Sequence, residues 1–157
     1  QGQTLVDHIQ SLYGKYGEFV SNNGYFILNA AAASTVVPEI MNHITENGSF
    51  GRTHVGDYEI ASIRYLGEPG YDSTSADKKP TLPTSASSPM VTIRFTNGGV
   101  AQFRASGTEP KFKYYMELPG APGVDRKTVE QDCKTWSETV LQELLRPDEL
   151  GLQRPGL

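Results

Sequence analysis

The amino-acid sequence predicts an α+β domain, in which an antiparallel sheet of about four to five strands is covered on one face by two helices. Two observations lead to this fold class. The first is a β-hairpin pattern: residues 91–96 and 100–105 are rich in apolar and branched side chains and flank the turn 97–99, Asn-Gly-Gly. The second is a pair of helical patterns, 34–47 and 125–145, each with one apolar stripe that can cover the sheet.

The individual elements follow from periodicity, capping residues and turn residues. In chain order we expect a helix over 4–16, a strand that ends near Leu28, a helix over 34–47, a strand over 57–66, the hairpin, a strand over 112–118 and a helix over 125–145. Thr4 begins a capping box, and apolar residues at helical spacing follow it until Gly17. Residues 22–24, Asn-Asn-Gly, interrupt the first β-prone segment, so we expect a turn or bulge there.

The two later helices each follow a residue that can cap them. Ser34 precedes the apolar stripe of the helix over 34–47, and Asn47 with Gly48 ends it. Asp125 stands between a Pro- and Gly-rich break and the stripe of the last helix. The short connections among the later strands favour antiparallel pairing.

A long loop, residues 67–89, separates the strand over 57–66 from the hairpin. It is rich in Pro and Ser and has too little apolar surface to form a core of its own. An ordered loop of this length is unusual unless it has a function. We expect its charged residues, Asp72 and the group at 77–79, to be solvated, and docking on a neighbouring domain is the alternative.

The size and charge of the chain exclude several classes of function. Its 157 residues suffice for one compact domain at about 100 to 200 residues per domain. The net charge of -4 gives no general field that attracts nucleic acid or an anionic membrane. The chain has a single cysteine, and its apolar runs are far shorter than the roughly 18 residues of a membrane span. We therefore expect a cytoplasmic protein that holds any bound anion locally.

One turn, residues 104–111, is dense in side chains and backbone groups that can bind an anion. Its candidate phosphate-binding residues are Arg104, Ser106, Gly107, Thr108 and Lys111. The glycine lets successive N–H groups point into one concavity, the hydroxyls donate hydrogen bonds, and an arginine can bind two phosphate oxygens at once. The alternative is an ordinary turn, in which Arg104 pairs with Glu109 or a cross-strand carboxylate and Lys111 is solvated.

The same turn carries a resemblance to a known family. Residues 104–118, RASGTEPKFKYYMEL, resemble the phosphate-binding loop of the α-D-phosphohexomutases, the superfamily of phosphoglucomutases and phosphomannomutases. Further similar segments are 70–72, 77–79, 82–85, 87–90 and 97–101, and these are typical of the eukaryotic phosphoglucomutase/phosphopentomutase branch. Lys113 is a departure from many bacterial members, which carry Arg, and this puts a phosphate contact from that position in doubt.

The resemblance implies a four-domain enzyme whose last domain is a TATA-box-binding-protein-like α+β module. That module binds the non-reacting phosphate of the substrate, a hexose or pentose phosphate. Residues 18–157 match it, and residues 1–17 look like the helix that connects it to a preceding domain. When the roles of the family motif are transferred to this sequence, the resemblance implies that Arg104 and residues 106–108 bind the phosphate, with Lys111 beside them. It also implies that Glu109 braces the loop.

The residues that perform the chemistry in this superfamily are missing from the chain, which has no serine loop, magnesium loop or sugar loop. We therefore expect no catalytic residue and no metal ligand here, with Mg²⁺ bound in another part of the full-length enzyme. The expected partners are a sugar phosphate and the other domains, without nucleic acid or membrane. The alternative reading is a stand-alone anion-binding or protein-interaction module without catalysis.

Overall fold

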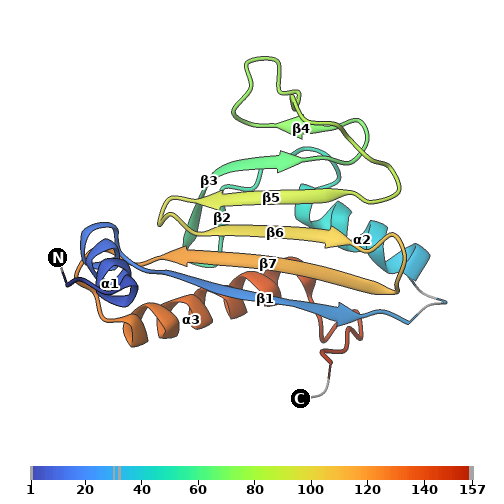
Figure 1. The fold of residues 1–157 in the computed structure, drawn as a ribbon. Coiled ribbons are helices and arrows are strands. Elements are labelled where there is room, and N and C mark those ends of the chain that lie inside the picture. Colours follow the sequence, from blue (N-terminus) through green and yellow to red (C-terminus); the bar gives the residue numbers. More distant parts are fainter. Residues whose placement is uncertain (1, 30, 32, 156–157) are drawn as a thin grey trace.

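Figure 1 shows the fold of the chain in a computed structural model, which describes residues 2–29, 31 and 33–155. Within these ranges the helices are α1 (Leu5–Tyr16), α2 (Ala33–Thr45) and α3 (Arg126–Leu145). The strands are β1 (Phe19–Ile27), β2 (His54–Val55), β3 (Tyr58–Tyr65), β4 (Tyr71–Asp72), β5 (Met90–Phe95), β6 (Val100–Ala105) and β7 (Lys111–Pro119). None of the described helices is long and apolar enough to span a membrane.

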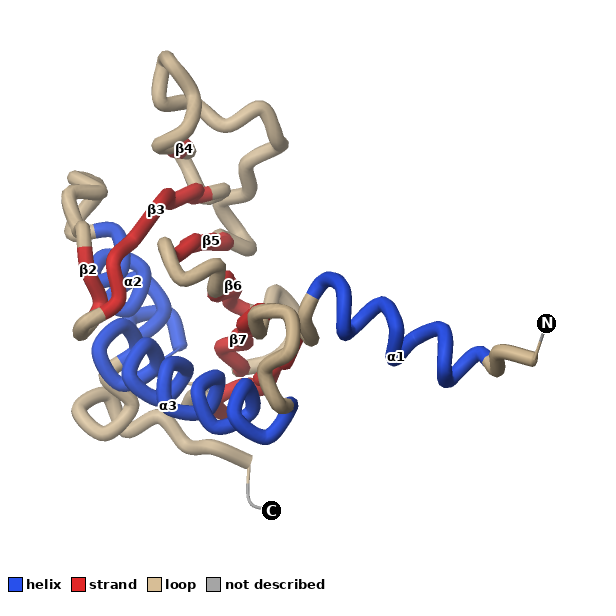
Figure 2. Tube along the Cα trace, turned by 90° about the vertical axis from the view of Figure 1, so that its left-hand side faces the viewer, coloured by secondary structure: helices blue, strands red, loops and turns tan. Residues whose placement is uncertain are grey.

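The strands form one antiparallel sheet in the order β1-β7-β6-β5-β3-β2, with β4 paired to β3. Figure 2 shows α2 and α3 together on one side of this sheet. The predicted α+β class and the placement of both helices on one face are therefore confirmed. The strand count of four to five is too low, because the short strands β2 and β4 carry no sequence pattern of their own.

The predicted interruption of the first strand is wrong. β1 runs without a break and pairs with β7 residue by residue along its whole length. Asn23 supports this pairing, since its Oδ1 accepts a hydrogen bond of 3.1 Å from the backbone N of Met116. Gly24 lies opposite Tyr114, and a Cβ at this position would overlap the Tyr114 hydroxyl. The glycine therefore marks a close approach between neighbouring strands rather than a turn.

The core lies between the sheet and the two helices on its face. Trp136 and Leu144 of α3, Ile40 of α2, and Phe103 and Phe112 of the sheet are all buried in it. Cys133 of α3 is also buried, and burial raises the pKa of its thiol, which favours an inert packed side chain. Alternate residues of β6 and β7 thus anchor these strands, and the residues between them face away from the helices.

Helix α1 stands apart from this core. Its capping box at Thr4 forms as the sequence predicts, with Asp7 as the partner. None of its residues is buried, and Figure 2 shows the helix projecting from the body. The apolar side chains that remain exposed on it include Leu5, Val6, Ile9, Leu12 and Tyr16. The helix therefore adds little to the stability of the described core.

The long loop is ordered by contacts with β3, and the expectation that Asp72 is solvated is wrong. The Asp72 side chain is only 4% exposed and accepts hydrogen bonds from the hydroxyl and backbone N of Thr74 and from Nε of Arg64. The hydrogen bonds of Thr74 outweigh desolvation and, with Arg64, lower the pKa of Asp72 from 3.8 to about 2. The charged residues at 77–79 of the same loop are exposed, as expected.

Asp72 should therefore contribute to acid stability. Its folded-state pKa is depressed, so its contribution is present above pH 4 and is lost as the pH falls toward 2. We expect Asp72→Asn to lower the free energy of unfolding at pH 7 by about 2 kcal/mol and to flatten its pH dependence between these values. Urea unfolding across this range measures both effects. Asp77→Asn, in the exposed part of the loop, is the matched control, and equal behaviour of the two variants would contradict the account.

Removal of residues 1–16 should leave the rest of the fold intact, because α1 buries no side chain. The free energy of urea unfolding should change by no more than about 0.5 kcal/mol, the size of an ordinary surface change. Leu144→Ala, in the buried core, should by contrast cost about 2 to 5 kcal/mol. A truncated chain that unfolds as readily as the core variant would show that α1 is part of the cooperative unit.

Candidate anion-binding site

The candidate site lies where β6 turns into β7. Arg104 near the end of β6 and Lys113 near the start of β7 are direct cross-strand partners. Their neighbours Phe103 and Phe112 are buried in the core, so alternation along the strands places both cationic side chains on the face without helices. The hairpin therefore brings two positive charges side by side.

A cavity of about 230 Å³ opens beside these two cations. It is lined by Ser88, Arg104, Ala105, Ser106, Gly107, Thr108, Lys113 and Tyr115. Four of the five residues that the sequence predicts for the site thus lie together. Because the cavity has two cations, three hydroxyl-bearing residues of the Ser and Thr type and a flexible glycine backbone, it offers donors to an anion from several directions.

Arg104 is free to bind an anion with its terminal nitrogens. Its Nε donates a hydrogen bond of 2.9 Å to Oγ of Ser88. Within the described part of the chain, the two terminal nitrogens have neither a hydrogen-bond partner nor an ion-pair partner. The alternative in which Arg104 pairs with Glu109 or a cross-strand carboxylate is therefore wrong.

Lys111 does not line this cavity, although the sequence predicts it as a site residue. Its Nζ lies 2.8 Å from Oε1 of Glu109 and 4.6 Å from the centre of the Tyr25 ring. The hydrogen bond between Lys111 and Glu109 raises the pKa of the lysine and lowers the pKa of the glutamate. Glu109 thus holds the side chain of the lysine two residues further along the chain.

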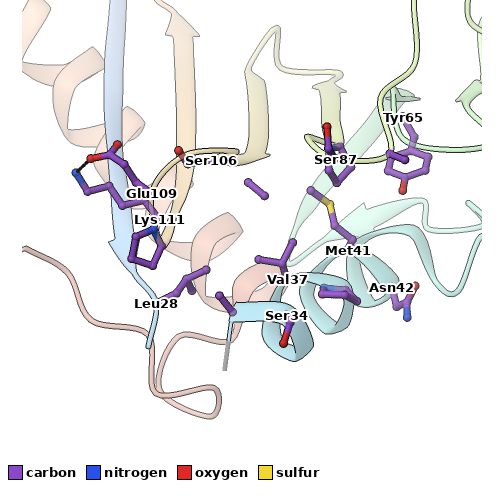
Figure 3. Close-up of a pocket in the computed structure, with 16 residues that line it drawn as sticks. Leu28, Ser34, Val37, Met41, Asn42, Tyr65, Ser87, Ser106, Glu109 and Lys111 are labelled. Carbon is purple, nitrogen blue, oxygen red and sulfur yellow. Dashed lines mark hydrogen bonds and ion pairs between the residues drawn. The ribbon is translucent and has the colours of Figure 1, made fainter. Parts of the chain in front are cut away.

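A second cavity, of about 410 Å³, lies on the other side of the loop and takes in Lys111. Figure 3 shows it between α2, the end of the long loop and the turn after β6, with Val37 and Met41 on one wall and Ser87 on another. Ser106 lines both cavities. The turn therefore separates a cationic cavity from a larger one with an apolar wall.

Four residues that line the cationic cavity are not among the site residues that the sequence predicts: Ser88, Ala105, Lys113 and Tyr115. Ser88 reaches it from the end of the long loop, 16 residues before Arg104, and no local pattern predicts that contact. The residue type of Lys113 puts a phosphate contact in doubt, yet strand alternation and its position opposite Arg104 both place its side chain at the cavity. Tyr115 lies two residues further along the same face.

The described residues do not form a metal site, since no group of three or more His, Cys, Asp or Glu side chains lies together among them. The cationic cavity itself is lined by no carboxylate. Its donor set fits an anion rather than a cation.

Comparison with known proteins gives relatives over almost the whole chain. Human phosphopentomutase is 34% identical over 151 residues, which is 96% of this chain and 24% of that protein. Human glucose 1,6-bisphosphate synthase is 33% identical over 150 residues, which is 95% of this chain and 24% of that protein. The probable phosphoribomutase of Schizosaccharomyces pombe is 31% identical over 159 aligned residues, and the match covers 99% of this chain and 26% of that protein. No family model matches the chain.

A solved structure shares the fold. Parafusin, a phosphoglucomutase from Paramecium in its open form, superposes with a TM-score of 0.56 over 98% of this chain and 25% of its own, at 13% identity. The chain thus spans about a quarter of the length of its relatives. It belongs, as a domain-sized segment, to the α-D-phosphohexomutase superfamily. Within that superfamily its relatives are the phosphopentomutase and phosphoglucomutase type of enzyme.

Proposed function

We propose that this chain binds the phosphate group of a sugar phosphate in the cationic cavity, as the C-terminal domain of a phosphoglucomutase/phosphopentomutase type of enzyme. The observation that carries the proposal is the pair of terminal nitrogens of Arg104, which has no partner among the described residues and lies beside Lys113 and the hydroxyls of Ser106 and Thr108 in one cavity. A phosphate monoester carries about -1.5 to -2 charges at pH 7 and three acceptor oxygens. The two cations match that charge, and the hydroxyls and backbone amides supply further donors.

The proposal assigns binding to this chain and chemistry to the rest of the enzyme. In the superfamily that the sequence resembles, a phosphoserine donates its phosphoryl group to the sugar phosphate, and the other phosphate of the bisphosphorylated intermediate then returns to the serine. Mg²⁺ would neutralise charge in that step, and the proposal places its ligands in another part of the enzyme. This chain holds the phosphate that is not being transferred, and it is inactive alone.

Residues 1–17 have a place in the same proposal. The exposed apolar side chains of α1, of which Leu5 is 74% exposed, need a partner in the whole enzyme. A connecting helix that packs on the preceding domain meets this need, and it leaves residues 18–157 as the phosphate-binding domain. The alternative, a stand-alone anion-binding or protein-interaction module, leaves the exposed apolar side chains of α1 without a neighbouring domain of the same chain to cover them.

Arg104→Ala should weaken binding of glucose 6-phosphate to this chain by about tenfold or more, since a charge-assisted hydrogen bond contributes roughly 1.5 to 3 kcal/mol. Titration calorimetry measures the change in Kd, and kcat/KM of the whole enzyme should fall by a similar factor. Arg94→Ala is the matched control, because Arg94 is an exposed arginine of β5 that lines a different cavity. Equal affinities of the Arg104→Ala chain and the unaltered chain would refute the proposal.

A further inference from the structure

The guanidinium of Arg104 is oriented by a residue far away in the sequence. Ser88 lies at the end of the long loop, and its Oγ accepts the 2.9 Å hydrogen bond from Nε of Arg104. The same Oγ donates a hydrogen bond of 3.2 Å to the carbonyl oxygen of Ala105. A serine hydroxyl has one proton, so the bond to Ala105 commits that proton and leaves a lone pair for the arginine.

Ser88 is itself held in place by the fold. Its backbone N donates to Oγ of Ser85 at 3.2 Å, and the backbone N of Ser85 donates to the carbonyl of Leu66 at 2.9 Å. Leu66 directly follows β3, and its own N donates to the carbonyl of Met90 at 2.8 Å. This chain of hydrogen bonds ties the end of the loop to two strands of the sheet, so the acceptor that Arg104 meets is fixed.

Serine is the residue type that this position needs. An arginine has many rotamers, and Arg104 is exposed, with Lys113 beside it as a cation that repels it. A carboxylate at residue 88 would hold the arginine but would neutralise its charge and compete with an incoming anion. A neutral hydroxyl that accepts a hydrogen bond from Nε holds the guanidinium in place without neutralising its charge. It also leaves the edge formed by the two terminal nitrogens available for bidentate binding.

We propose that Ser88 is a positioning residue, which orients the guanidinium of Arg104 so that both terminal nitrogens face the bound phosphate. This inference rests on the proposed function of the cavity and extends it to the long loop. The end of that loop then completes the site, and its order is a requirement for tight binding.

The experiment uses the whole 157-residue chain, with inorganic phosphate and glucose 6-phosphate as the probes. NMR measures the exchange of the Arg104 Nε–H with water in the absence of ligand, and calorimetry measures Kd. Ser88→Ala should speed this exchange and weaken phosphate binding by about threefold to tenfold, the range for one lost hydrogen bond. Ser88→Thr, which keeps the hydroxyl, should restore both values. Ser75→Ala is the control, because Ser75 belongs to the same long loop but lines neither cavity.

A double-variant cycle separates positioning from general loss of structure. A lysine side chain ends in an ammonium group and has no guanidinium Nε–H for Ser88 to orient. In an Arg104→Lys chain, the further change Ser88→Ala should therefore not weaken phosphate binding. An equal loss in the arginine and lysine chains would overturn the positioning role. The role also fails if Ser88→Ala leaves Nε–H exchange and Kd unchanged while Arg104→Ala weakens binding, and in that case the proposed function stands. Failure of the unaltered chain to bind either probe would overturn both.

Discussion

Arg104 and Lys113 face each other across neighbouring strands, so the sheet holds two positive side chains at the rim of one cavity. Like charges in this position repel, and the repulsion destabilises the hairpin unless a negative group lies nearby. Glu109 offsets this repulsion only in part, because its carboxylate lies 3.8 Å from Nζ of Lys113 and forms a closer ion pair, at 2.8 Å, with Nζ of Lys111. In the proposed function, a bound phosphate relieves this repulsion.

The rest of the fold serves to keep this arrangement rigid. Phe103 and Phe112 are fully buried on the opposite face of the same two strands, and they fix the register that sets the two cations side by side. The long loop adds an acceptor from a distant part of the chain, and buried Asp72 anchors the loop to β3. A site built on strands with a packed core is held more precisely than one carried by a loop alone.

Local patterns were sufficient for much of the fold. The hairpin of β5 and β6 and the stripes of α2 and α3 depend on turn chemistry and periodicity, which are properties of short segments, and the structure has them close to the expected bounds. The predicted turn at Gly24 is wrong because, in sequence, a glycine that makes room for the ring of Tyr114 cannot be told apart from a glycine that makes a turn. β2 and β4 were not predicted, since strands of two residues depend on their partners rather than on their own composition.

The site also contains residues that the sequence predicts correctly and residues whose place depends on tertiary contacts. Arg104, Ser106, Gly107 and Thr108 are consecutive or nearly so and line one cavity, as their residue types together with the family resemblance of the turn predict. Lys111 is a weaker candidate beside these residues in sequence, and in the structure the carboxylate of Glu109 two residues away holds its side chain at the second cavity.

Ser88 could not be assigned a role from the sequence, because its contact with Arg104 depends on how a loop of more than twenty residues returns to the sheet. Long-range contacts of this kind are set by tertiary structure and leave no periodic signal.

The most direct test of the central claim is a crystal structure of this chain with glucose 6-phosphate at saturating concentration. The account predicts the phosphate in the cationic cavity, with its oxygens within about 3 Å of the terminal nitrogens of Arg104 and of the hydroxyls of Ser106 and Thr108. A phosphate bound elsewhere, with the guanidinium of Arg104 turned away from it, would contradict the account.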